Sequence, residues 1–336
     1  MRKLVIFGNG LGRALDSDYF QLELALHDAW NDSLILSQQQ KELIHQCLPF
    51  EILEDNENTA PQSEAQLDRL QRVLAACDEI SKYQSADGAN WLTDDGMQFP
   101  FAIRSYIHRA ACYFHSGGHE LPAEFVSPLV EWVVASRSHI ATLNYDELLY
   151  RAFIGTDAFS GYGCLLDGFV PHFDPSHLDR FYPKTQSYYL HLHGSPLYHS
   201  HSDGSLRKSS LADLDFLEGF SSTHLVLTHV HHKAAVISAS PILREYWRRL
   251  ETSMKEADGS IFFGYGGGDL HLILLVSKYF RDKQVEIVER RHLEYGTEIG
   301  KNERIQYWAT KLGVKTVYAF WHENILDHKF WSWEKK

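Results

Sequence analysis

The 336-residue sequence predicts an α/β protein with a parallel sheet that carries helices on both faces and a large helical insertion after the first strand. Two features predict this fold class. Short continuous apolar runs such as Leu4–Phe7 and Ile261–Phe263 are typical of strands that are buried on both faces. Each run is followed by glycines and then by a helical segment, which is the strand–turn–helix order of parallel βαβ units.

Composition and charge are those of an ordinary globular protein. Hydrophobic residues make up 44% and charged residues 23% of the chain. The formal net charge of −12 argues against nucleic-acid binding by the whole surface. No apolar run approaches the ~20 residues that span a bilayer. The N-terminal run Leu4–Phe7 is too short for a signal peptide, so we expect a cytoplasmic protein without membrane attachment.

The cysteines and histidines give no complete metal site. No two cysteines form a CxxC pair, which excludes a structural zinc ribbon; they are Cys47, Cys77, Cys112 and Cys164. The clusters HSHSD (199–203) and HVHH (229–232) each offer two ligands at strand spacing and no third ligand. We therefore expect neither zinc nor another metal ion.

The elements divide the chain into a Rossmann-like core, about 1–19 and 137–336, and a helical insertion, 20–136, within a single domain. The insertion is predicted to hold helices at Phe20–Trp30, Gln39–Gln46, Glu64–Ser81, Phe101–Phe114 and Phe125–Ser136, with loops at 54–63 and 85–96. In the second half, strands are expected at Ile140–Leu143, Tyr188–His193, Leu225–Thr228, Gln284–Val288 and Val314–Phe320, and helices at Pro241–Lys255, from Asp269 to about Arg281, and at Asn302–Leu312. Residues 159–168 are interpreted as a glycine-rich loop.

Asn144 follows the strand Ile140–Leu143 in the stretch HIATLNYDELLY (139–150). Open α/β sheets bind their ligands at the carboxyl ends of strands, so Asn144 and Asp146 are candidates for a site. The alternative is a helix cap, because Asn144 with Glu147 three residues later resembles a capping box. The sequence alone leaves both interpretations open.

Two glycine turns follow buried strands and favour a phosphate-bearing ligand. The first, Gly8-Asn9-Gly10, could bring backbone amides to a phosphate, or could be only a tight turn, since Arg13 replaces the last glycine of the dinucleotide fingerprint. The second, 264–269, precedes a helix and a strand that ends with Glu289. Glu289 lies about 20 residues beyond the turn, the offset at which an acid meets a ribose hydroxyl in dinucleotide-binding folds.

His193 ends a strand and is followed by Gly194, the usual place for a working side chain. His191 would lie deeper on the same face and is the better candidate for a structural role. A purely structural role for His193 remains the alternative.

Four short motifs in this order resemble the sirtuin-like NAD-binding family: GNG (8–10), TLNYD (142–146), LHGS (192–195) and GYGGGD (264–269). Tyr145 and the GYGGGD form resemble the bacterial branch that hydrolyses NAD during antiviral defence. The resemblance implies that Asn144 and His193 are the catalytic pair and that Asp146 contacts the nicotinamide end. With the turns above, the expected NAD-binding residues are Gly8, Asn9, Gly10, Asp146, Gly194, Ser195, Gly264, Gly266, Gly267, Asp269 and Glu289.

The resemblance implies an NAD glycohydrolase that releases nicotinamide and ADP-ribose, a homo-oligomer, and control by assembly or by a partner such as a neighbouring ATPase. The PDFR element and the paired-cysteine zinc module of protein deacylases are missing, which argues against deacylation. A deacylase or ADP-ribosyltransferase, and a non-catalytic nucleotide sensor, remain alternatives.

Overall fold

The computed structural model describes residues 1–48, 60–64, 66–83, 85, 87–160, 164–210, 223–227, 230–290 and 298–327. Its centre is a seven-stranded parallel sheet in the order β3-β4-β2-β1-β7-β8-β9. The strands are β1 (Lys3–Phe7), β2 (His139–Thr142), β3 (Leu165–Leu166), β4 (Ser187–His191), β7 (Gly259–Phe263), β8 (Gln284–Arg290) and β9 (Thr316–His322). The predicted α/β, Rossmann-like fold class is confirmed. A separate antiparallel hairpin joins β5 (Tyr198–Ser200) to β6 (Leu206–Lys208).

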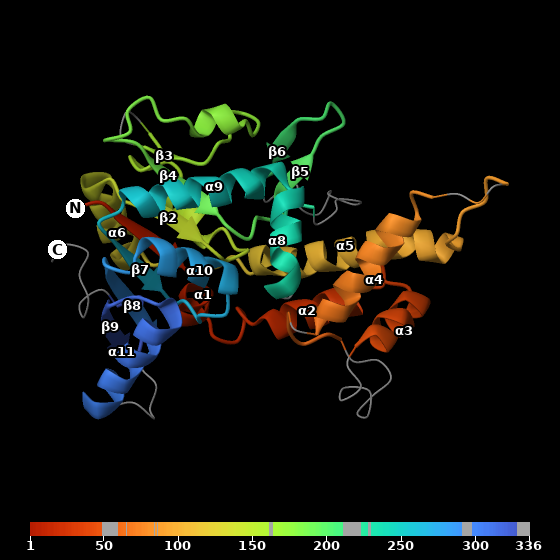
Figure 1. Cartoon of the computed structure of the whole chain (residues 1–336), viewed down its shortest axis with the longest axis horizontal. Coiled ribbons are helices and arrows are strands. Elements are labelled where there is room, and N and C mark those ends of the chain that lie inside the picture. The colour runs from red at the N-terminus through yellow and green to blue at the C-terminus, as the bar shows by residue number, and fades with distance from the viewer. Residues whose placement is uncertain are drawn as a thin grey trace.

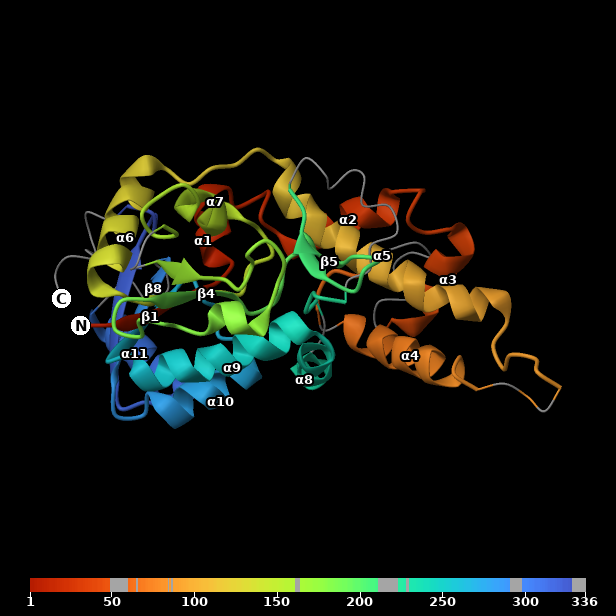
Figure 2. The same ribbon diagram turned by 90° about the horizontal axis from the view of Figure 1, so that it is seen from above.

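Both faces of the sheet are buried, as the continuous apolar runs predict. In β1, Val5 and Phe7 belong to one hydrophobic core, and Leu4 and Ile6 belong to the other. The first core lies under α1 (Gly10–Leu15), α6 (Ala123–Ser136) and α7 (Leu148–Phe153), and the second under α9 (Pro241–Glu256), α10 (Leu270–Tyr279) and α11 (Glu298–Leu312). Figure 2 shows α9 and α10 on the side of the sheet opposite α6 and α7.

The helical insertion forms a lobe at one end of the molecule (Figure 1). The lobe consists of α2 (Leu22–Asn31), α3 (Gln38–Cys47), α4 (Leu67–Ile80) and α5 (Asp94–Ser116). Its core is continuous with that of the first sheet face, since Trp30 and Tyr106 belong to the same cluster as Val5 and Phe7. The last helix before β2, α6, leaves the lobe and packs Phe125 against Phe263 of β7, with 5.4 Å between the ring centroids. The lobe and the sheet therefore share one core.

Two helix starts in the lobe follow from local capping. Ser37 and Gln40 form a reciprocal capping box at the start of α3. Thr93 accepts a hydrogen bond from the Gly96 N–H, and Asp94 and Asp95 place negative charge in the first turn of α5. This helix begins seven residues before the predicted start, so the predicted loop over 85–96 is wrong at its end. Residues 54–59 of the other predicted loop lie outside the described residues.

Three predictions in the second half are wrong. Residues 225–227 make only an isolated bridge to Gly194 and do not join the sheet as a strand. Leu165 and Leu166, within the predicted loop 159–168, pair with β4 as the edge strand β3. Residues 230–232 of HVHH begin helix α8 (Val230–Ala239), so the strand spacing assumed for their histidines does not apply. Among the described helices, none is long and apolar enough to cross a bilayer.

Candidate functional site

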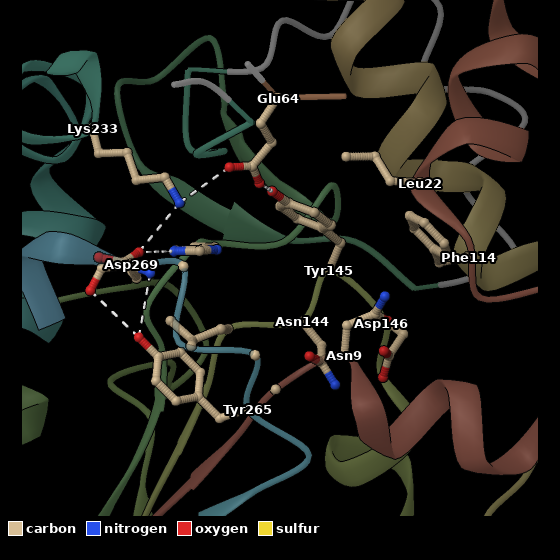
Figure 3. A pocket seen from close by; sticks show the side chains of 15 residues that line it. Asn9, Leu22, Glu64, Phe114, Asn144, Tyr145, Asp146, Lys233, Tyr265 and Asp269 are labelled. Atoms are coloured by element: carbon tan, nitrogen blue, oxygen red, sulfur yellow. Dashed lines mark hydrogen bonds and ion pairs between the residues drawn. The ribbon is translucent and has the colours of Figure 1, made fainter. Parts of the chain in front are cut away.

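A cavity of about 220 Å³ opens at the carboxyl ends of the central strands, where the strand order reverses on either side of β1. Residues from both halves of the sheet, from the lobe and from α8 meet there (Figure 3). The lining residues are Gly8, Asn9, Leu22, Glu64, Phe114, Leu143, Asn144, Tyr145, Asp146, His193, Lys233, Tyr265, Gly266, Gly268 and Asp269. The structure thus brings together Asn144, Asp146, His193 and Asp269, which the sequence distributes over 126 positions.

Asn144 points into this cavity and does not cap a helix. The α7 N-cap is Glu147, and no side-chain hydrogen bond caps that helix. Asn144 is 4% exposed, and neither its Nδ2 nor its Oδ1 makes a hydrogen bond with the described residues. Buried amides are nearly always paired because an unpaired one costs about 1–3 kcal/mol. The Asn144 amide is therefore available to a ligand.

His193 is held by Asp269. The His193 Nε2 lies 2.8 Å from Asp269 Oδ2, and both side chains are buried. Burial alone would raise the pKa of Asp269, but the hydrogen bond from His193 and the charge of Lys233 hold that pKa well below its usual range. An ionised carboxylate only accepts, so the Nε2 of His193 carries the hydrogen. In the neutral imidazole, Nδ1 is then the basic nitrogen.

Asp269 itself has a different role from the expected one. Its Oδ1 accepts the Leu272 N–H and caps α10, while Oδ2 faces His193 and Lys233. Both oxygens are therefore engaged with the protein. Asp269 orients the histidine and starts a helix, and it does not present a free carboxylate to a ligand.

Eight of the lining residues were missed by the sequence reasoning, and three of these, Lys233, Glu64 and Tyr145, form one chain of contacts. Lys233 Nζ lies 3.2 Å from Asp269 Oδ2 and 3.3 Å from Glu64 Oε2. The Tyr145 hydroxyl donates to the Val226 carbonyl at 2.7 Å and lies 3.3 Å from Glu64 Oε1. Figure 3 shows this chain of contacts across the cavity. No periodicity or spacing links positions 64 and 233; only the TLNYD motif could have drawn attention to Tyr145.

Asp146 lines the cavity and is unusually basic for a carboxylate. Burial raises its pKa to about 6, although a hydrogen bond from the Leu148 N–H opposes this shift. The Asn144 amide also favours the charged form without reaching hydrogen-bond geometry. Asp146 therefore changes charge near neutral pH inside the site.

Gly8 and Asn9 of the first glycine turn line the cavity, but the Gly8 and Gly10 amides that were expected to meet a phosphate are paired within the chain. The Gly8 N–H donates to the Phe263 carbonyl, and the Gly10 N–H donates to the Gly264 carbonyl, both at 2.9 Å. A Cβ on Gly8 or Gly10 would lie within 2.7 Å of Gly264 backbone atoms. Glycine is required at both positions because the two glycine turns are in backbone contact. The Asn9 side chain is also engaged within the protein, since its Nδ2 donates a hydrogen bond to the Phe20 carbonyl.

In the second turn, Gly266 is open to the cavity and Gly267 is not. A Cβ on Gly266 would meet no atom within 4 Å, whereas Gly267 packs against Lys311 and Trp308. Gly264 has φ +60° and lies against Gly10, so its role is the contact between turns. Of the glycines predicted to bind a ligand in this turn, Gly266 is the one that lines the cavity.

Gly194 and Ser195 do not reach the cavity. Gly194 was expected to leave room for a substrate beside His193, but a Cβ there would lie 1.7 Å from the carbonyl oxygen of His224. The glycine therefore admits the segment 223–227, which also hydrogen-bonds to the His193 carbonyl through Val226. Ser195 is buried, and its hydroxyl accepts the Leu197 N–H in a local turn.

Glu289 is also away from the cavity. Its carboxylate forms a two-point ion pair with Arg304 at 2.8 and 2.7 Å and accepts the indole N–H groups of Trp308 and Trp321. Both carboxylate oxygens of Glu289 therefore accept hydrogen bonds from side chains of α11 and β9. The 21-residue offset from Gly268 therefore reflects the length of a βαβ unit, and a ribose contact is not supported.

His191 differs from His193 although it lies two residues away. His191 is fully buried, and burial lowers its pKa well below the ordinary value, so it is neutral. Its ring contacts the aromatic rings of Tyr189, Tyr150 and Tyr198. This environment agrees with a structural role.

Within the described ranges, no group of three or more His, Cys, Asp or Glu side chains is arranged to hold a metal ion.

Comparison of the chain with protein-family models and with curated proteins finds no match. The fold defines the class of α/β proteins with a Rossmann-like sheet, and the cavity lies at the switch point of that sheet.

Proposed function

We propose that the protein is an NAD glycohydrolase that cleaves the bond between nicotinamide and ribose. The observation that carries the proposal is the meeting, in one cavity, of an unpaired buried amide, Asn144, with a histidine held by a carboxylate, His193–Asp269. Such a pair can support cleavage of an N-glycosidic bond to a cationic base. The amide orients a water molecule or a ribose hydroxyl, and the histidine takes its proton.

The charge of the lining supports a cationic substrate end. Three carboxylates, Glu64, Asp146 and Asp269, line the cavity with the single cation Lys233 among its described lining residues. Negative charge stabilises both the pyridinium of the bound substrate and the oxocarbenium-like charge that moves onto the ribose in the transition state. Phe114, Tyr145 and Tyr265 supply aromatic surface for a planar ring.

The size of the cavity supports binding of the nicotinamide–ribose end of NAD. About 220 Å³ is below the ~300–1,000 Å³ of sites for drug-sized ligands, so the cavity fits the nicotinamide–ribose end. Gly266 and Gly268 form the exposed side of the opening, where the rest of a dinucleotide would continue. The Gly8 and Gly10 amides are paired within the chain, so we do not assign the pyrophosphate to them.

The test is incubation of the purified protein with NAD, with and without an acylated peptide, followed by chromatography of nicotinamide and ADP-ribose. We expect nicotinamide release without peptide, and at least a tenfold lower turnover in His193→Gln at an unchanged melting temperature. His191→Gln is the matched control and should act through stability. Release that depends on the peptide would favour deacylation, and binding of NAD without cleavage would favour a sensor.

The biological setting is part of the same proposal. An enzyme that empties the NAD pool needs control, and we propose a cytoplasmic role in bacterial antiviral defence with activity released by self-assembly or by a partner such as an ATPase. Size-exclusion chromatography with light scattering, run alongside the hydrolysis assay over a range of protein concentrations, tests the assembly. Turnover per chain that is independent of concentration and of oligomeric state would contradict it.

A further inference from the structure

Lys233 does not contact His193 directly, but both side chains contact the same oxygen of Asp269. It comes from α8, its side chain is 5% exposed, and its Nζ lies 3.2 Å from the Oδ2 of Asp269 that also meets His193. We propose that Lys233 is a positioning residue that sets the proton affinity of His193 through this shared carboxylate oxygen. The inference rests on the proposed function, because the importance of that proton depends on the reaction.

The geometry leaves the carboxylate little freedom. The Leu272 N–H fixes Oδ1 at the start of α10, so Oδ2 is directed at His193 and Lys233 together. The lysine charge keeps Asp269 ionised, which keeps the Nε2 hydrogen of His193 in place. The same positive charge disfavours a second positive charge on the imidazole, so the proposal predicts that loss of Lys233 makes His193 easier to protonate.

Glu64 balances Lys233 from the other side. It precedes α4 in the helical lobe, and its Oε2 lies 3.3 Å from Lys233 Nζ. A buried lysine with two carboxylate partners is far less costly than an isolated one. The Glu64–Lys233 pair also connects the lobe to the partner of His193, so a shift of the lobe would change the proton affinity of His193.

Other groups face the histidine as well. Tyr145 stacks on the His193 ring with 6.1 Å between centroids, and Tyr265 meets Asp269 at 3.3 Å from its hydroxyl to the backbone nitrogen. Asp146 lines the same cavity. None of these residues is substituted in the variants below, and of the three only Tyr145 contacts a substituted side chain, Glu64, with which its hydroxyl keeps a hydrogen-bond partner in Glu64→Gln.

The charges predict shifts of opposite sign. Removing the cation in Lys233→Met, which keeps the length of the buried stem, should move the ascending limb of the pH–rate profile to higher pH by about one unit. Removing the anion in Glu64→Gln leaves the lysine charge uncompensated and should move the limb to lower pH. Lys233→Arg keeps the charge and should restore most of the wild-type midpoint.

The experiment records kcat/KM for NAD against pH for the wild type and these three variants, with melting temperatures throughout. Lys3→Met is the matched control: Lys3 is also a buried lysine paired with an acid, Glu286, but at the amino ends of the strands. It should lower stability and leave the midpoint unchanged. A midpoint that does not move in Lys233→Met and Glu64→Gln, or that moves in the same direction in both, would overturn the proposal.

A second readout separates this inference from the proposed function. The imidazole of His193 can be titrated by NMR in the resting protein, with His193→Gln used for assignment. Opposite shifts of the titration midpoint in Lys233→Met and Glu64→Gln would support the role of Lys233 even if the wild type released no nicotinamide. Nicotinamide release with an unshifted titration would leave the proposed function standing and remove Lys233 from it.

Discussion

Truncation of Asn144 should abolish activity without destabilising the protein, and the two effects can be given magnitudes. Relief of an unpaired buried amide gains about 1–3 kcal/mol, and lost contacts of a side chain that faces a cavity offset part of this. We expect the unfolding free energy of Asn144→Ala to change by about 0 to +1 kcal/mol. For 336 residues the unfolding entropy is about 0.7 kcal/mol/K, so the melting temperature should rise by at most about 2 °C.

The helix-cap interpretation predicts the opposite sign. Loss of a cap costs about 1 kcal/mol, and serine, which can cap, would restore it. Because Asn144 caps no helix in the structure, Asn144→Ala and Asn144→Ser should be equally stable. Both variants should lose turnover about 10²-fold or more, which is the loss typical of removing an oriented amide from an active site. The assay pairs nicotinamide release with thermal denaturation followed by circular dichroism. An alanine variant that melts earlier while the serine variant keeps wild-type turnover would refute the reasoning.

Three further predictions follow from the other contacts. Glu289→Gln should lower stability by about 3–5 kcal/mol, because Arg304 loses a buried partner, and should leave the KM for NAD unchanged in the folded fraction. The pKa of Asp146 is raised from 3.8 to about 6, so between these pH values the folded state binds a proton that the unfolded state does not. The stability of the protein should therefore fall by up to about 3 kcal/mol as the pH rises from about 4 to 6. Asp146→Asn should remove this loss, as measured by melting curves at pH 4 and 8. Gly266→Ala should fold normally and raise the KM for NAD. Gly264→Ala should melt below the native temperature, because Gly264 has a positive φ and lies against the backbone of Gly10. Equal behaviour of the two variants would contradict this assignment.

The fold could be predicted from the sequence because buried parallel strands carry a direct signature. Runs such as Leu4–Phe7 have no polar position, and each is followed by a turn and a helix, which leaves few topologies open. The start of α5 was missed although Thr93 with Asp94 and Asp95 is an ordinary capping signal. The short edge strand β3 has only two residues, too few to show any period.

The candidate site could be predicted only where strand ends define it. Asn144, Asp146 and His193 follow strands that lie side by side, so their meeting follows from the sheet. Lys233 and Glu64 meet through tertiary packing of α8 on the lobe, which no local pattern records.

The predicted roles of several glycines and of Glu289 find no support in the contacts that these residues make. A glycine that admits another backbone segment, such as Gly8 or Gly194, looks in sequence like one that admits a phosphate. Likewise, a count of residues to Glu289 does not reveal that α11 presents Arg304 to it.

The two duties of the Asp269 carboxylate have a genetic consequence. One oxygen starts α10 and the other holds His193, so a substitution at Asp269 removes a helix cap and the histidine support together. Asn144 contributes nothing comparable to folding. If cells are challenged to survive overproduction of the protein, the inactive chains that still accumulate at normal levels should carry changes at Asn144, whereas chains changed at Asp269 should be depleted by proteolysis.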